Sequence, residues 1–145
     1  MIGFLNLGVV GLILSTFTTR FIFPMISLEG RRFWILGTLP VRRDTILWSK
    51  FLFACAASIV PCAILIFLSD TMLGIQQTAP HFVLVHQIVC GVLCVGLSAI
   101  AVGLGARLPN LREISSAKIA AGFGGTLNLV LSGIFIIAMV LATAV

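Results

Sequence analysis

Residues 82–104 read FVLVHQIVCGVLCVGLSAIAVGL, an apolar run without a single Asp, Glu, Lys or Arg. An α-helix rises about 1.5 Å per residue, so about 20 such residues cross the hydrocarbon core of a bilayer. Three further apolar blocks of similar length accompany it: Ile2–Thr19, Phe51–Ser69 and Ile119–Leu141. We therefore expect an all-α, polytopic helical bundle with four spans, forming one transmembrane domain over residues 1–145.

The composition of the whole chain supports this interpretation. Of the 145 residues, 60% are hydrophobic and 9% are charged, with a mean hydropathy of +1.23, whereas soluble domains carry about 25% charged residues. The net charge of +5 could also attract nucleic acid. However, the basic residues flank the apolar blocks, and no separate folded platform is left to present them. We expect contact with membrane lipid headgroups and no nucleic-acid partner.

The cationic residues are divided unequally between the two sides of the predicted bundle. If every block crosses, connections 20–50 and 106–118 lie on one side, and together they hold all nine Lys and Arg residues. The connection on the other side, residues 70–81, contains no Lys or Arg. By the positive-inside rule, both basic connections are cytoplasmic. We therefore expect a multi-pass protein of the cell (inner or plasma) membrane, with both ends of this chain outside.

The longer basic connection is not uniformly polar, and it suggests two helices. Ser27 can N-cap a short amphipathic helix over residues 28–38. Pro40 cannot continue that helix, because it lacks a backbone N–H and its ring clashes with the preceding turn. A second helix is expected to restart near residues 42–43 and to run through Lys50 into the second span.

The shorter basic connection contains the dipeptide Pro109-Asn110, which is typical of a turn. Ser115 or Ser116 then provides a hydroxyl that can cap the fourth span. We therefore expect one turn followed directly by the last transmembrane helix.

Isolated polar residues inside the blocks predict contacts between helices. Asn6 and Asn128 can form interhelical hydrogen bonds, although such residues also line transport pathways. His86 and Gln87 can pair with another helix near the external surface. No charged residue lies in the middle of a block, where a proton-coupled carrier would need one. Motifs typical of an intramembrane enzyme are also missing from the sequence.

All four cysteines, Cys55, Cys62, Cys90 and Cys94, fall within the apolar blocks, which argues against a disulfide framework. His86, Cys90 and Cys94 recur every four residues, so they share one stripe of a helix and could form a set of soft metal ligands. Thiolates are costly in hydrocarbon, however, and no fourth ligand is evident. We therefore expect the thiols to act as small hydrophobic groups and assign no metal site.

Two stretches carry a more specific signal. The first, FPMISLEGRRFWILGTLPVRRDTILWSKFLF, covers residues 23–53, and the second, GLGARLPNLREISSAKIAAGFGGTLNLVLS, covers residues 103–132. They resemble the cytoplasmic loops of ABC-2 type permeases, in particular the ABC exporter group. The positions that match the family pattern are Ser27, Glu29, Gly30, Phe33, Trp34, Leu39, Pro40, Lys50, Gly105, Pro109, Glu113, Lys118, Gly124 and Gly125. The chain departs from it at residues 116–117, where many relatives have Asn-Pro.

The resemblance implies a permease subunit that works as a homodimer or heterodimer with a cytoplasmic ABC ATPase subunit. It implies that the helix at 28–39 docks on the ATPase, through an ATPase-coupling loop and a second cytoplasmic loop. The first comprises Ser27, Glu29, Gly30, Arg31, Arg32, Phe33, Trp34, Pro40 and Lys50; the second comprises Pro109, Arg112, Glu113 and Lys118. Without the resemblance, the aromatics would be expected to lie at the membrane interface and the arginines to set topology. Relatives have six or more spans, so the chain is expected to be a fragment or to lack spans supplied elsewhere.

The chain has no G-x-x-x-x-G-K-[ST] loop, whose amides and Lys would bind phosphates. The glycine-rich run GFGGT at residues 122–126 contains no Lys and opens a span. We therefore expect no enzyme activity and no cofactor in this chain, with ATP bound by a partner subunit. The alternative function is a non-transporting membrane scaffold or assembly protein, and the sequence leaves the transported substrate open.

Overall fold

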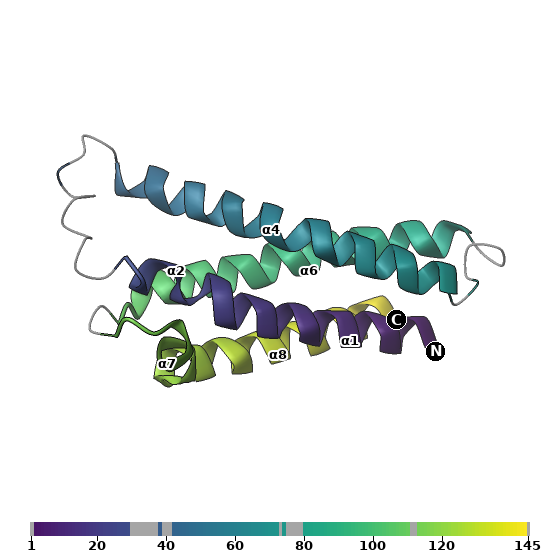
Figure 1. Ribbon diagram of the computed structural model, residues 1–145. Coiled ribbons are helices and arrows are strands. Elements are labelled where there is room, and N and C mark those ends of the chain that lie inside the picture. The colour runs from purple at the N-terminus through teal and green to yellow at the C-terminus, as the bar shows by residue number, and fades with distance from the viewer. Residues whose placement is uncertain are drawn as a thin grey trace.

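The computed structural model describes residues 2–29, 38, 42–72, 74, 80–110 and 113–144, and these residues form helices and turns without strands. The four long helices are α1 (Ile2–Phe17), α4 (Arg43–Met72), α6 (Pro80–Arg107) and α8 (Phe123–Ala144). Three short elements accompany them: the π-helical turn η1 (Thr18–Ile22), α2 (Pro24–Ser27) and α7 (Ser116–Ala121). The long helices run side by side, with both termini at one end of the bundle and α2 and α7 at the other (Figure 1).

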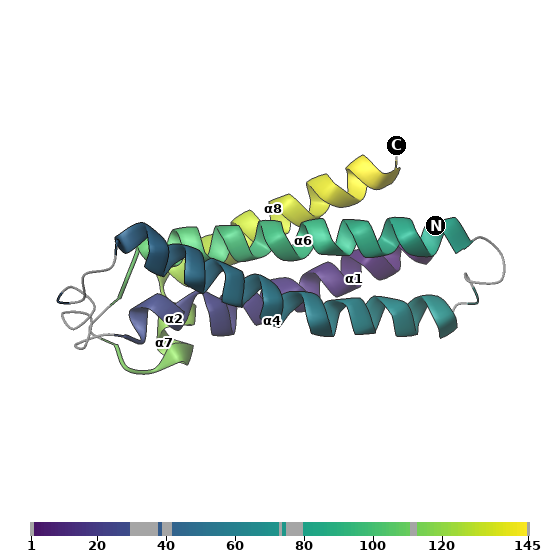
Figure 2. The same cartoon turned by 90° about the horizontal axis from the view of Figure 1, so that it is seen from above.

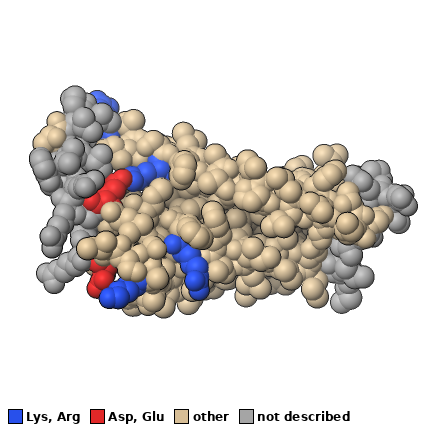
Figure 3. Space-filling view, viewed as in Figure 1, with Lys and Arg blue, Asp and Glu red and all other residues tan. Residues whose placement is uncertain are grey.

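Four segments are long and apolar enough to cross a membrane, as the sequence predicted: Leu5–Ser27, Asp44–Met72, Val83–Arg107 and Phe123–Thr143. The described charged side chains visible on one face of the molecule gather over the half that carries α2 and α7 (Figure 3). We call this half the basic end. The 30 residues of α4 rise about 45 Å, which exceeds the hydrocarbon thickness by about 15 Å. A helix of this length can therefore extend beyond the hydrocarbon core.

Two of the four spans are central and two are peripheral. α6 packs against α1, α4 and α8, and α1 also packs against α4 and α8. Accordingly, the most apolar 18-residue stretches of the first and third spans are 56% and 50% buried, but those of the second and fourth are only 28% and 22% buried. The C-terminal part of α8 also leans away from α6 (Figure 2). α4 and α8 thus present apolar faces that suit lipid or another transmembrane helix.

The buried side chains form two clusters. One involves all four long helices: Leu7, Val10, Leu14, Cys62, Ile66, Val89, Cys90, Leu93, Cys94, Leu97 and Ile136. The other lies at the basic end: Ile22, Phe23, Ile26, Ala54, Ala101, Val102 and Ile119. The first cluster contains three of the four cysteines, and the second surrounds the junction of η1 with α2.

The first span is longer than the sequence predicted, because the helix continues past Thr19 as far as Ser27. Pro24 explains how it continues. A proline ring clashes with the carbonyl of the preceding turn, and a π-turn relieves such a clash by widening the backbone. The Phe23 N–H donates to the Thr18 carbonyl oxygen five residues earlier, at 2.8 Å. Phe23 is consequently buried in the bundle rather than placed in a connection.

Ser27 does not cap a helix that begins at Leu28, which corrects the sequence prediction. Ser27 is the last residue of α2, and Leu28 keeps helical backbone angles of φ −68° and ψ −19°. The Leu28 N–H donates to the Pro24 carbonyl oxygen at 2.8 Å, so this stretch still continues the preceding turn. Of the helix expected over residues 28–38, the structure describes Leu28, Glu29 and Thr38 only.

The restart of the chain into the second span is confirmed, since α4 begins at Arg43 and continues through Lys50 without a break. Its other end differs from the prediction. The helix runs to Met72, so Asp70 lies within it and is fully buried, although the sequence placed this residue in the external connection. A buried carboxyl needs a polar partner, and one is available on α6.

The fourth span does not start at Ile119 as predicted, because the chain bends at Gly122. This residue is extended, with φ −73° and ψ 176°, and separates α7 from α8. Ser115 precedes α7, but its side chain makes no capping hydrogen bond. The bend brings the Ala120 carbonyl so close to Gly125 that a Cβ at Gly125 would lie 1.9 Å from this oxygen. Only glycine therefore fits at position 125 without a backbone shift.

We predict that Gly125→Ala destabilises the bundle by about 1–3 kcal/mol, the usual cost of overpacking, because the added methyl group meets backbone rather than a flexible side chain. The matched control is Gly133→Ala in the same helix, where an added Cβ has no neighbour within 4 Å. Heating followed by size-exclusion chromatography of the detergent-solubilised protein measures both. Equal stability of the two variants would contradict the close approach at Gly125.

Candidate functional site

An ion pair joins the first span to the second at the basic end. The Lys50 ammonium in α4 contacts the Glu29 carboxylate, which follows α2. The side chains are only 13% and 29% exposed, respectively, so water screens the pair less than it would screen a surface pair. The resemblance implies that Glu29 contacts the ATPase, and in the structure one oxygen of its carboxylate contacts Lys50 in α4. The ion pair thus holds together two residues that both match the family pattern.

A hydrogen bond connects the same region to the second basic connection. The backbone N–H of Asn110 donates to the Ser27 hydroxyl at 3.1 Å, and Ser27 is fully buried. Asn110 immediately follows Pro109, the turn residue predicted from the sequence. The hydroxyl predicted to cap a helix therefore links the end of α2 to the segment that leaves α6.

Phe23 fills the space between these segments, and two glycines of the family pattern accommodate it. A Cβ at Gly105 in α6 would lie 2.8 Å from the Phe23 carbonyl oxygen. A Cβ at Gly124 in α8 would lie 2.7 Å from the Phe23 ring. A side chain at position 105 would meet backbone, so this close approach requires glycine. A side chain at position 124 would require the buried Phe23 ring to shift. The matched glycines act in packing at this end of the bundle.

A pocket of about 630 Å³ opens beside the π-turn, between the first span and α7–α8. Its lining combines the exposed Arg20 with the hydroxyl-bearing residues Thr16, Thr19, Ser116 and Thr126. A guanidinium surrounded by hydroxyls can bind an anionic group such as a phosphate. The sequence places Arg20 in a basic connection, and the pocket is formed only by the tertiary fold.

The remaining predicted site residues are only partly described. Lys118 in α7 and Pro109 are exposed, and Glu113 is partly buried. Seven residues of the two predicted loops lie outside the described residues: Gly30, Arg31, Arg32, Phe33, Trp34, Pro40 and Arg112. Leu39, which matches the family pattern, also lies outside them. The described part of the site thus consists of the helix ends at the basic end, the ion pair between Glu29 and Lys50, and the hydrogen bond between Asn110 and Ser27.

Polar pairs connect the helices in the other half of the bundle, as the sequence predicted for His86 and Gln87. His86 Nδ1 lies 3.0 Å from Asp70 Oδ1, and both side chains are buried. Gln87 Nε2 donates to the Ala63 carbonyl oxygen of α4 at 3.2 Å. Asp70 is a partner that sequence reasoning missed. Two features of the sequence could have indicated this pair: a single acidic residue next to the second span and a single histidine in the third.

The two asparagines within the spans also bond to neighbouring helices. The Ser69 hydroxyl donates to Asn6 Oδ1 at 2.9 Å, which joins α4 to α1. Asn128 Nδ2 donates to the Thr19 hydroxyl at 2.8 Å, which joins α8 to η1. The interhelical role expected for Asn6 and Asn128 is confirmed for both.

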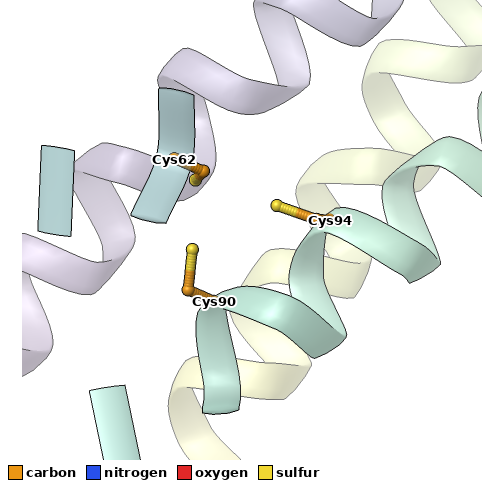
Figure 4. A group of neighbouring side chains, drawn as sticks. All are labelled: Cys62, Cys90 and Cys94. Atoms are coloured by element: carbon orange, nitrogen blue, oxygen red, sulfur yellow. The ribbon is translucent and has the colours of Figure 1, made fainter. Parts of the chain in front are cut away.

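The cysteines form a different group from the one considered in the sequence. Cys62 from α4 meets Cys90 and Cys94 from α6, and the three Sγ atoms lie within 4.8 Å of one another (Figure 4). His86, which the sequence pattern grouped with Cys90 and Cys94, is paired with Asp70 instead. Helix periodicity reveals only residues on one helix, so it could not identify Cys62 as the third member.

We predict that Glu29→Lys lowers the free energy of unfolding, because it places two lysines, at positions 29 and 50, side by side. The expected loss is about 1.5–3 kcal/mol, which is the contribution of a hydrogen bond to a charged group. The double variant Glu29→Lys/Lys50→Glu should recover most of the loss. Thermal unfolding in detergent measures both effects. Asp44→Asn at the exposed start of α4 is the control, with an expected loss of at most about 1 kcal/mol from the first turn of the helix. A double variant less stable than Glu29→Lys would argue against the ion pair.

We further predict that Asp70 and His86 are energetically coupled. In a double-mutant cycle of Asp70→Asn and His86→Leu, the coupling should be about 0.6–1.7 kcal/mol, as for hydrogen bonds between transmembrane helices. Thermal unfolding of the four proteins gives the value. Strictly additive losses would show that the contact contributes nothing to stability.

Comparison with known proteins places these features in a family. The family model described as "Putative ATP-binding cassette" matches residues 1–145, so it covers the glycines, the ion pair and all four spans. No curated protein and no solved structure matches the chain significantly. Because the match extends over the full sequence rather than over one motif, we conclude that the chain belongs to this ABC-related family.

Proposed function

We propose that the chain is a membrane-spanning permease subunit of an ABC-type exporter, which couples ATP hydrolysis by a separate subunit to translocation of a substrate. The family match, the four apolar spans and the resemblance of both basic connections to ABC-2 permeases support this proposal. The observation that carries it is the family match over residues 1–145. The ion pair between Glu29 and Lys50 connects the start of the proposed coupling segment to two spans at once.

The contacts at the basic end offer a route for movement. Residues 5–27 form one helical segment, so a displacement just beyond it acts directly on the first span. The ion pair passes the same displacement to α4, and the bond between Ser27 and Asn110 passes it to the end of α6. Packed helices shift as rigid units, and ATPase closure would therefore tilt three spans together. In this proposal the basic end faces the cytoplasm, in line with the positive-inside rule.

The peripheral helices leave room for the second permease subunit that the proposal requires. On the outer face of α4 and α6, a groove of about 300 Å³ is lined by Leu47, Trp48, Phe51 and small residues that include Ala99 and Gly103. Small residues permit close approach of a further helix within a bilayer. We propose that substrate passes by alternating access between paired permease subunits. ATP binds only to the partner ATPase in this scheme.

We predict that Glu29→Lys lowers the substrate-stimulated ATPase activity of the reconstituted complex at least about tenfold, because the coupling segment loses its link to α4. A tenfold loss of rate corresponds to about 1.4 kcal/mol. The complex should still assemble. The swapped variant Glu29→Lys/Lys50→Glu should regain stimulation, and Asp44→Asn should keep it. Wild-type stimulation in Glu29→Lys would exclude a major coupling role for the ion pair.

Copurification separates the permease from the alternative scaffold function. An ABC ATPase subunit should remain bound to the affinity-tagged chain in mild detergent, because coupling requires a stable contact. A complex without an ATPase, from cells that produce both proteins, would favour a scaffold or assembly protein.

A further inference from the structure

Three thiols from two helices converge inside the bundle. Cys62, Cys90 and Cys94 are 4%, 2% and 0% exposed, respectively, and each Sγ atom lies within 4.8 Å of the other two. Figure 4 shows the α4 cysteine facing the pair that successive turns of α6 present. Around a central atom, three sulfur ligands at about 2.3 Å are about 4.0 Å apart in a planar arrangement and about 3.5 Å apart in a pyramidal one. A closure of at most about 1.3 Å between the Sγ atoms would therefore convert the group into a three-sulfur coordination site.

The surroundings decide what kind of ion this group can take. The neighbours in the same buried cluster are aliphatic, among them Leu14, Ile66, Leu93 and Leu97. A net charge is costly in such an environment. Three thiolates around a monovalent ion leave a charge of −2, and around a divalent ion they leave −1. A trivalent ion gives a neutral complex.

An apolar approach to the site favours the same class of ligand. A groove of about 120 Å³ between α1 and α4 reaches Cys62, and its other lining residues include Val10, Leu14, Pro61 and Leu65. A hydrated cation would lose its water along this path without finding polar groups in exchange. A neutral hydroxide of a trivalent element carries no charge that must be desolvated.

We propose that Cys62, Cys90 and Cys94 form a binding site for a trivalent thiophilic metalloid, arsenic(III) or antimony(III). Arsenite enters as neutral As(OH)₃. Three S–H bonds and three As–O bonds break, three As–S bonds form, and the thiol protons leave with the hydroxides as three molecules of water. No electron is transferred and no charge is created. The bound element links α4 to α6, whether or not the chain acts in transport.

Cys55 provides a matched control within the same protein. It is also buried on α4, at 8% exposure, but it does not belong to the group of three. A loss of binding caused by general disturbance of the core would appear in Cys55→Ser as well. A loss that depends on convergence of the three sulfur atoms would spare it.

The test uses the full chain, purified in detergent with a phosphine reductant and titrated with arsenite. We expect one arsenic per chain by elemental analysis after gel filtration, and three As–S bonds by X-ray absorption. Each of Cys62→Ser, Cys90→Ser and Cys94→Ser should weaken binding by at least about 100-fold, while Cys55→Ser binds as the wild type does. Circular dichroism shows whether each variant keeps its helices.

Several results would overturn the proposal. These are an absence of stoichiometric arsenic on the folded wild-type protein, two rather than three As–S bonds, or equal loss of binding in Cys55→Ser. Tight binding of Cd²⁺ without binding of arsenite would contradict the argument from charge. Because every readout is binding to the isolated chain, failure of this proposal and failure of the transport proposal can be told apart.

Discussion

Hydrocarbon offers polar groups no partner, so a polar group inside a span is stabilised by a partner within the protein. Among the described residues, the carboxyl, imidazole and amide side chains of the spans bond to neighbouring helices. Asn128 Oδ1 and the hydroxyls of Ser58, Ser98 and Ser132 are buried without a hydrogen-bond partner. Asp70 pairs with His86, and Asn128 bonds to Thr19. Such bonds contribute only about 0.6 kcal/mol each on average. Their larger effect is to specify which faces of the helices meet, because a rotated helix would leave a carboxyl or an amide without a partner.

The same solvent also explains the glycines of the basic end. Lipid tails are as apolar as leucine side chains, so helices in a membrane associate through close contact rather than through exclusion of water. Gly105 and Gly124 admit Phe23, and Gly125 admits the carbonyl of Ala120. Positions that match the family pattern are thus explained by packing. They determine where the first span, α6 and α8 meet, and hence where the connections begin.

The described links at the basic end join the first span to α4 and to the segment that follows α6. Glu29 and Ser27 bond to other segments of the same chain. A partner that acts on the neighbouring residues would therefore move several helices together. The thiol group belongs to the other buried cluster, among side chains of all four long helices. The links at the basic end and the thiol group therefore involve separate sets of contacts, although both join α4 to neighbouring segments.

The sequence by itself determined the number of spans, their approximate positions and the gathering of the cations, because hydropathy and charge are local properties of each segment. It also identified Asn6, His86, Gln87 and Asn128 as residues that bond between helices. Only the tertiary structure decided that Cys62 joins Cys90 and Cys94, that Glu29 meets Lys50, and that Asp70 lies inside the bundle. Each of these depends on how one helix is rotated about its axis against another. That rotation is set by packing over whole helices, and no short stretch of sequence records it.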